Sequence, residues 1–166
     1  MRSKNTQQAI EWHHQFISAF SYGYFITINS NRFEGIHWLG PSTFDDFEAK
    51  LRSIVHGLNV YCLGRPYQRN EKRLQSLVAM EIGKENSRLH SHIFALSDTP
   101  VGRTVPEVDT RLRRKIVGSY GLPTENDAID VQEFLPALAL NGGNKYFHKC
   151  SDYMMNKYGV ANCFIV

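Results

Sequence analysis

Residues 77–96 read LVAMEIGKENSRLHSHIFAL, and this stretch decides the fold. Its two ends, 77–82 and 89–96, are apolar runs, and the polar segment GKENSR separates them. Short apolar runs bounded by Gly, Asn and Ser are typical of two strands joined by a turn. The stretch therefore predicts an antiparallel hairpin that buries one face against a hydrophobic core.

Strand and helix patterns continue on both sides of this hairpin. Runs of aromatic and β-branched residues predict strands, and apolar residues at helical spacing predict helices. We expect strands at 24–29, 59–63 and 128–134, helices at 44–58, 108–117 and about 143–157, and a helix or ordered arm over 1–21. Few helices and hairpin-connected strands predict an α+β fold, in which helices pack on one face of an antiparallel sheet.

The helix at 44–58 has the clearest pattern in the chain. The hydroxyl residues Ser42 and Thr43 precede it, acidic residues occupy its first turn, and Gly57 is expected to end it. Its apolar positions recur every three or four residues, which predicts a buried face made of Phe44, Phe47, Leu51, Ile54 and Val55.

The composition limits the class of protein. The chain has 166 residues, of which 42% are apolar and 21% charged. This excludes a disordered chain and predicts a single domain over residues 1–166. The charge sum of 19 − 16 = +3 permits a nucleic-acid partner without requiring one. No stretch has the length of a membrane span, and three scattered cysteines are typical of a reduced protein, so we expect a cytoplasmic chain without a membrane partner.

His90 and His92 are the most informative residues of the hairpin. Residues two apart on a strand point to the same face, so the two imidazoles should converge. Glu81 lies nine positions before His90, and antiparallel pairing places it opposite one of the histidines on that face. Two histidines and a carboxylate suit a divalent metal with open coordination positions. The alternative is that the two histidines merely lie on an exposed sheet face.

The predicted last helix carries a second group of candidate catalytic residues. Tyr146 and Lys149 are three positions apart, and Tyr153 and Lys157 are four apart, so each tyrosine shares a helix face with a lysine. An ammonium favours the phenolate form of tyrosine and also binds phosphate, and a phenolate is a nucleophile. The alternative is a solvated amphipathic face.

These motifs, in this order, resemble those of HUH endonucleases, and in particular the rolling-circle replication initiators of small plasmids and single-stranded DNA phages. The sequence FITIN at 25–29 is similar to the family's FLTLT strand. His90-Ser91-His92 is similar to the family's strand with two histidines. The sequence KYFHKCSDY at 145–153 is similar to the KYxxKxSDY helix of some plasmid initiators. The resemblance covers residues 24 to about 157.

The resemblance implies a fold and a reaction. The fold would be a ferredoxin-like antiparallel sheet with helices packed on it, carrying a metal site on its open face. The reaction would be metal-dependent, site-specific nicking and rejoining of single-stranded DNA at a replication or transfer origin, through a covalent 5′-phosphotyrosine. By this match, His90, His92 and Glu81 hold Mn²⁺ or Mg²⁺. Tyr146 is the nucleophile and Lys149 is its partner, and Tyr153 is the second choice of nucleophile.

The same resemblance implies partners and a location. Some relatives have a second catalytic tyrosine or a glutamate one turn before the nucleophile, where this chain has Gly142, which implies either a single-tyrosine enzyme or a dimer. The protein would then be a monomer or a homodimer. No GxxxxGK[ST] motif is present, so a host helicase would unwind the duplex. The enzyme would act in the cytoplasm, at the nucleoid or in an infected host cell.

Basic residues outside the motifs are candidates for binding DNA phosphates, in a salt-dependent way. A solvated surface would explain them equally well. The candidates are Arg69, Arg111, Arg113, Arg114, Lys115 and Lys145.

Three other functions remain open. The first is a non-catalytic protein that binds single-stranded nucleic acid on the same fold by stacking and charge. The second is a phosphoesterase with a pair of His-x-Ser/Thr motifs, although this chain offers one such motif and no twin. The third is a regulatory protein of a mobile element that keeps the fold.

Overall fold

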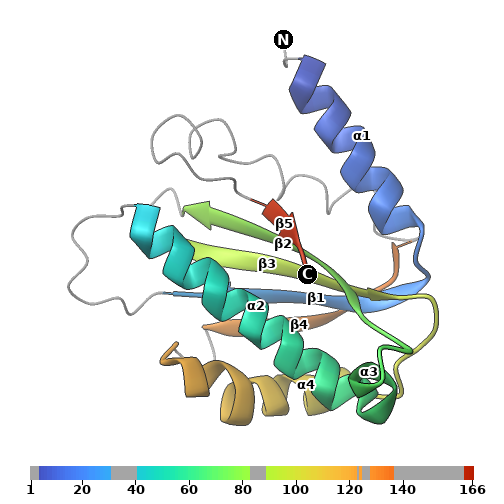
Figure 1. Ribbon diagram of the computed structural model, residues 1–166, viewed down its shortest axis with the longest axis vertical. Helices are drawn as coiled ribbons and strands as arrows, with labels where there is room; N and C mark the ends of the chain where they lie inside the picture. The colour runs from blue at the N-terminus through green and yellow to red at the C-terminus, as the bar shows by residue number, and fades with distance from the viewer. Residues whose placement is uncertain (1–3, 31–40, 83–88, 123, 125–127, 137–162) are drawn as a thin grey trace.

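The computed structural model describes residues 4–30, 41–82, 89–122, 124, 128–136 and 163–166, and these form an α+β fold (Figure 1). The strands are β1 (Tyr22–Asn29), β2 (Gln75–Ile82), β3 (Leu89–Ser97), β4 (Ile129–Phe134) and β5 (Cys163–Ile165). The helices are α1 (Lys4–Ser18), α2 (Pro41–Leu63), α3 (Arg65–Gln68), α4 (Val105–Arg111), the π-helix η1 (Leu112–Ile116) and the 3₁₀ helix η2 (Val117–Tyr120).

The strands form one sheet in the order β4-β1-β3-β2-β5, and every neighbouring pair is antiparallel. The predicted hairpin is present as β2 and β3, and the predicted strands 24–29 and 128–134 are present as β1 and β4. The prediction of an α+β fold with an antiparallel sheet is therefore confirmed. The narrower assignment to a ferredoxin-like fold stays a prediction.

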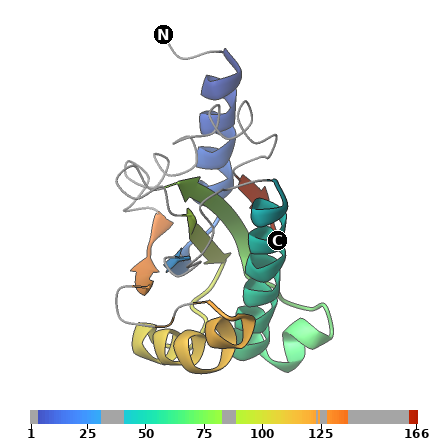
Figure 2. The same cartoon turned by 90° about the vertical axis from the view of Figure 1, so that its left-hand side faces the viewer.

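One face of the sheet is covered by α2 and α4, which lie side by side in both views (Figures 1 and 2). The side chains of this face alternate with those of the opposite face along each strand, so Ile26, Val78 and Ile93 point into the core. The predicted face of α2 is confirmed, because Phe44, Phe47, Leu51, Ile54 and Val55 are all buried in that core.

The predicted strand 59–63 and the predicted helix end at Gly57 are wrong, because α2 continues to Leu63. Gly57 lies where α2 approaches η1: a Cβ there would be 3.1 Å from Ile116 Cγ2, so a glycine permits the contact. Asn59 is buried, and its amide donates to Val55 O and accepts from the Leu74 backbone N–H. Packing on the core thus overrides the strand-like composition of 59–63.

Several other boundaries differ from the expected ones. The predicted helix 108–117 is instead the succession of α4, η1 and η2, which begins at Val105 after a Thr104–Glu107 cap. The short helix α3 and the short strand β5 have no counterpart in the prediction. The predicted helix at about 143–157 lies outside the described residues.

The opposite face of the sheet has its own, smaller core. Ile17 of α1 packs there with Leu77, Phe94, Leu96 and Phe134 from three strands, which confirms a helix in the N-terminal segment. His13 of the same helix is buried, and its Nε2 lies 3.5 Å from Cys163 Sγ of β5. Burial raises the pKa of the Cys163 thiol. Helix α1 therefore covers one part of this face.

None of the described helices combines the length and the hydropathy that a bilayer crossing requires.

Candidate metal centre

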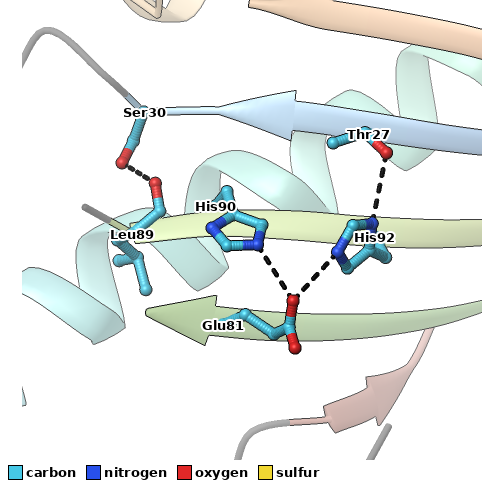
Figure 3. A network of polar contacts seen from close by, with 6 residues as sticks. All are labelled: Thr27, Ser30, Glu81, Leu89, His90 and His92. Carbon is cyan, nitrogen blue, oxygen red and sulfur yellow. Dashed lines mark hydrogen bonds and ion pairs between the residues drawn. The ribbon is translucent and has the colours of Figure 1, made fainter. Parts of the chain in front are cut away.

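The candidate metal site lies on the β2–β3 hairpin, on the sheet face opposite α2 and α4 (Figure 3). Glu81 is paired directly with His90, and Ala79 is paired with His92. Glu81 and both histidines therefore share one face, while Ser91 between the histidines points into the core with its side chain fully buried. The prediction that Glu81 lies opposite one of the two histidines, on their face, is confirmed, and the structure shows that this histidine is His90.

The three side chains converge on one carboxylate oxygen. His90 Nε2 lies 2.9 Å from Glu81 Oε2, and His92 Nε2 lies 3.1 Å from the same oxygen. The Glu81 side chain is fully buried, the His92 side chain is 8% exposed and the His90 side chain is 17% exposed. Solvent or a ligand can therefore reach the site at His90 more readily than at the other two residues.

The chemistry of this donor set fits a divalent cation. One ligand atom from each residue lies within 4.8 Å of the others. A buried carboxylate is costly unless a cation or several hydrogen-bond donors face it, and here the donors are two imidazoles. Imidazole nitrogens and carboxylate oxygens are ordinary ligands of first-row metals, and three protein ligands leave positions for water or substrate oxygens.

Strand β1 supports the ring of His92 from the other side. Thr27 is paired with His92, and its Oγ1 lies 3.1 Å from His92 Nδ1. The ring of Phe25, two residues earlier on the same face, is stacked on the His92 ring with 5.5 Å between centroids and 10° between planes. The orientation of this ligand is thus set by two contacts from β1 as well as by Glu81.

Four of the candidate phosphate-binding residues lie on the sheet face opposite the metal ligands. The run Arg111–Lys115 belongs to α4 and η1, whose buried side chains Val108, Leu112 and Ile116 pack into the core behind the sheet. The run therefore does not border the metal ligands. The reason is topological, because both connecting helices cover the face from which the metal ligands point away.

These basic residues have different roles within the helix layer. Arg113 is half-buried and bonds to Asp109 and to the carbonyls of Thr124 and Ile129, so it holds the layer together. Arg111, Arg114 and Lys115 are exposed and line a hollow of about 500 Å³ beside Tyr61. The Arg111 guanidinium lies 5.3 Å from the centroid of the Tyr61 ring.

The remaining predicted site residues are not brought to the metal ligands by the described structure. Arg69 is exposed, follows α3, and has Glu71 3.9 Å away. It precedes the start of β2, whereas Glu81 lies at the other end of that strand. Tyr146, Lys149, Tyr153 and Lys145 lie outside the described residues.

Thr27 and Phe25 were not predicted as parts of the site. A signal for them was present, because residues 25 and 27 alternate with the core residues Tyr24, Ile26 and Ile28 and so belong to the face that carries the histidines. What the sequence did not reveal was the strand order, which places β1 directly beside β3.

Comparison of the chain with protein-family models, with curated proteins and with solved structures gives no match.

Proposed function

We propose that the protein is a metal-dependent endonuclease that nicks and rejoins single-stranded DNA through a covalent 5′-phosphotyrosine, as in rolling-circle replication initiation. The observation that carries the proposal is the convergence of His90, His92 and Glu81 on one face of the central hairpin. The order of the three sequence motifs also supports the proposal. HUH endonucleases, which these motifs resemble, carry such metal ligands on an antiparallel sheet.

The side chains of the site would act together on the scissile phosphate. His90, His92 and Glu81 would hold Mn²⁺ or Mg²⁺, and the bound ion would supply Lewis-acid stabilisation of the charge that develops on the phosphate. The burial of Glu81 and His92 excludes water on one side of the site, and the more exposed His90 marks the side from which a DNA strand would approach.

The covalent step would be a transesterification. The phenolic oxygen of Tyr146 forms a bond to phosphorus, and the bond from phosphorus to the 3′-oxygen of the preceding nucleotide breaks. The proton that leaves the phenol is balanced by the proton that the departing 3′-oxygen gains. Lys149 would stabilise the phenolate or orient the phosphate, and Tyr153 is the second choice of nucleophile. Because one ester replaces another, the reverse step rejoins strands without ATP.

The same proposal includes a DNA origin as substrate, a host helicase as partner, a monomeric or homodimeric enzyme, and action in the cytoplasm, at the nucleoid or in an infected host cell. The exposed residues Arg111, Arg114 and Lys115 remain candidates for binding phosphates by charge. Because they lie behind the sheet, they would bind a different segment of nucleic acid from the one at the metal ligands.

The test is formation of a covalent adduct between the protein and a pool of single-stranded oligonucleotides of randomised sequence, labelled at the 3′ end. Wild-type protein with Mn²⁺ should give a labelled protein band on a denaturing gel, and chelation with EDTA should abolish it. Tyr146→Phe should remove the adduct, whereas Tyr158→Phe, a tyrosine outside the motif, should retain it.

Two results would count against the proposal. The first is an adduct that persists in the double variant Tyr146→Phe/Tyr153→Phe. The second is a wild-type protein that binds the pool equally well with and without metal and forms no adduct, which is the behaviour of the non-catalytic binding protein. A His90→Ala variant separates the two functions, because nicking needs this ligand and binding by charge and stacking does not.

A further inference from the structure

The ring of His92 is held at both of its nitrogens, by partners of different chemistry. Nε2 lies 3.1 Å from Glu81 Oε2, and Nδ1 lies 3.1 Å from Thr27 Oγ1 (Figure 3). An ionised carboxylate only accepts hydrogen bonds, whereas a hydroxyl both donates and accepts. The nitrogen that faces the carboxylate must therefore carry a proton to form its hydrogen bond, whereas the nitrogen that faces the hydroxyl can either donate or accept.

The partners fix the tautomer of a neutral His92. When no ion is bound, Nε2–H donates to Glu81, so Nδ1 carries a lone pair and accepts the hydrogen bond of the Thr27 hydroxyl. A cation bound at Nε2 requires the lone pair there, so the proton lies on Nδ1 and the same hydroxyl becomes its acceptor. Thr27 satisfies both states because its hydroxyl rotates between the two roles.

The position of the Thr27 hydroxyl is set by the sheet. Thr27 is paired with His92 on one side and with Asp130 on the other, so its backbone is held within an interior strand. A β-branched side chain has few rotamers in a strand, which limits where Oγ1 lies. The stacked Phe25 ring fixes the plane of the imidazole, so that Nδ1 points at this hydroxyl.

His90 offers an internal comparison. Its Nε2 bonds to Glu81, but among the described residues its Nδ1 has no hydroxyl partner like Thr27. Its ring and the His92 ring form a T-shaped pair, with 5.2 Å between centroids. Support from outside the hairpin is therefore concentrated on one of the two histidines.

We propose that Thr27 is a positioning residue of the metal centre, whose hydroxyl presents the Nε2 lone pair of His92 to a divalent ion. This inference rests on the proposed function, of which it names a further part. The proposal gives β1 a role beyond its place in the core. Phe25 and Thr27 orient His92, and Glu81 and His90 are the other two ligands of the site.

The experiment measures binding of Mn²⁺ alone, in the absence of DNA, by calorimetry and by the electron paramagnetic resonance signal of the free ion. Thr27→Val keeps the shape of the side chain and removes the hydroxyl, and should weaken Mn²⁺ binding about 10- to 100-fold, as loss of such outer contacts does at other metal sites. Thr27→Ser keeps the hydroxyl and should stay within about threefold of wild type, since it restores both hydrogen-bonding roles.

Matched controls separate this role from a structural one. Thr99→Val makes the same chemical change at an exposed position and should leave Mn²⁺ binding unchanged. The metal-free denaturation midpoint of each variant shows whether the fold is intact. A Thr27→Val protein that folds like wild type but binds Mn²⁺ weakly supports the proposal.

The outcomes distinguish this inference from the proposed function. If Thr27→Val binds Mn²⁺ as tightly as wild type, or if Thr27→Ser loses as much affinity as Thr27→Val, the role of the hydroxyl is overturned while the nuclease remains possible. If wild type binds Mn²⁺ and Thr27→Val binds it more weakly, yet wild type forms no adduct with DNA, the positioning role stands and the nuclease falls. A wild-type protein that binds no Mn²⁺ overturns both.

Discussion

Arg113 and Asp109 are joined by two hydrogen bonds across one turn of the helix layer, from Nε at 2.7 Å and from Nη2 at 2.9 Å. The same guanidinium donates to the Thr124 carbonyl at 3.1 Å and to the Ile129 carbonyl at the start of β4. Arg113, which the sequence offers as a candidate for binding DNA, thus connects a helix, a loop and a strand.

Arg113→Ala should lower the free energy of unfolding by about 1.5–3 kcal/mol, because it removes hydrogen bonds of a charged group that is half-buried. Urea denaturation followed by circular dichroism measures the change. Arg114→Ala, one residue along on the exposed side, should stay within about 0.5 kcal/mol of wild type. Equal stability of the two variants would show that the Arg113 contacts contribute little.

Binding of a divalent ion should stabilise the protein through Glu81. With Mn²⁺ at about 100 times its dissociation constant, linkage predicts a gain of about 2.7 kcal/mol over the metal-free protein. Glu81→Gln removes the charge that a cation needs and should abolish this gain. Thermal denaturation with and without Mn²⁺ measures it, and Glu133→Gln, an exposed residue of β4, is the matched control. A gain that survives in Glu81→Gln would place the ion elsewhere.

Ser91→Ala should stabilise the protein. The Ser91 side chain is fully buried between the two histidines, on the core side of β3, and its hydroxyl has no hydrogen-bond partner among the described residues. A buried hydroxyl without a partner costs about 1–3 kcal/mol, so its removal should raise the free energy of unfolding by about 1 kcal/mol after the loss of packing. Ser119→Ala, whose hydroxyl donates to Ile116 O, should not stabilise.

The Ser91 prediction is checked by urea denaturation, and Mn²⁺ binding serves as a second measurement. Ser91 faces away from the ligands, so Ser91→Ala should leave the affinity for Mn²⁺ unchanged. A destabilised Ser91→Ala protein would mean that the hydroxyl has a partner that offsets its burial.

Local patterns predicted the hairpin and the face that Glu81 shares with the two histidines, but they left open which histidine lies opposite Glu81. The period of two along 77–82 and 89–96 indicates which side chains share a face, and Glu81, His90 and His92 follow from it. The buried face of α2 was also predicted correctly, because Phe44, Phe47 and Leu51 recur at helical spacing. Both results depend on residues close in sequence, where periodicity carries the information.

What could not be predicted depends on contacts between distant parts of the chain. The segment 59–63 has a strand-like composition, but in the structure it continues α2, where Leu58 is buried in the core and Asn59 bonds to Val55 and Leu74. The pairing of Thr27 with His92 joins residues 65 positions apart and requires the strand order. The placement of the basic run behind the sheet likewise depends on which face α4 covers.

The direct pairing of Glu81 with His90 makes ion binding a measure of correct strand alignment. If β2 slid by one residue against β3, the carboxylate would turn inward and Met80 or Ile82 would lie opposite His90 instead. A misaligned molecule would keep its secondary structure, and circular dichroism would hardly detect it, yet it would have lost one of three ligands. The stoichiometry of a Mn²⁺ titration would therefore count the correctly aligned fraction of a refolded preparation.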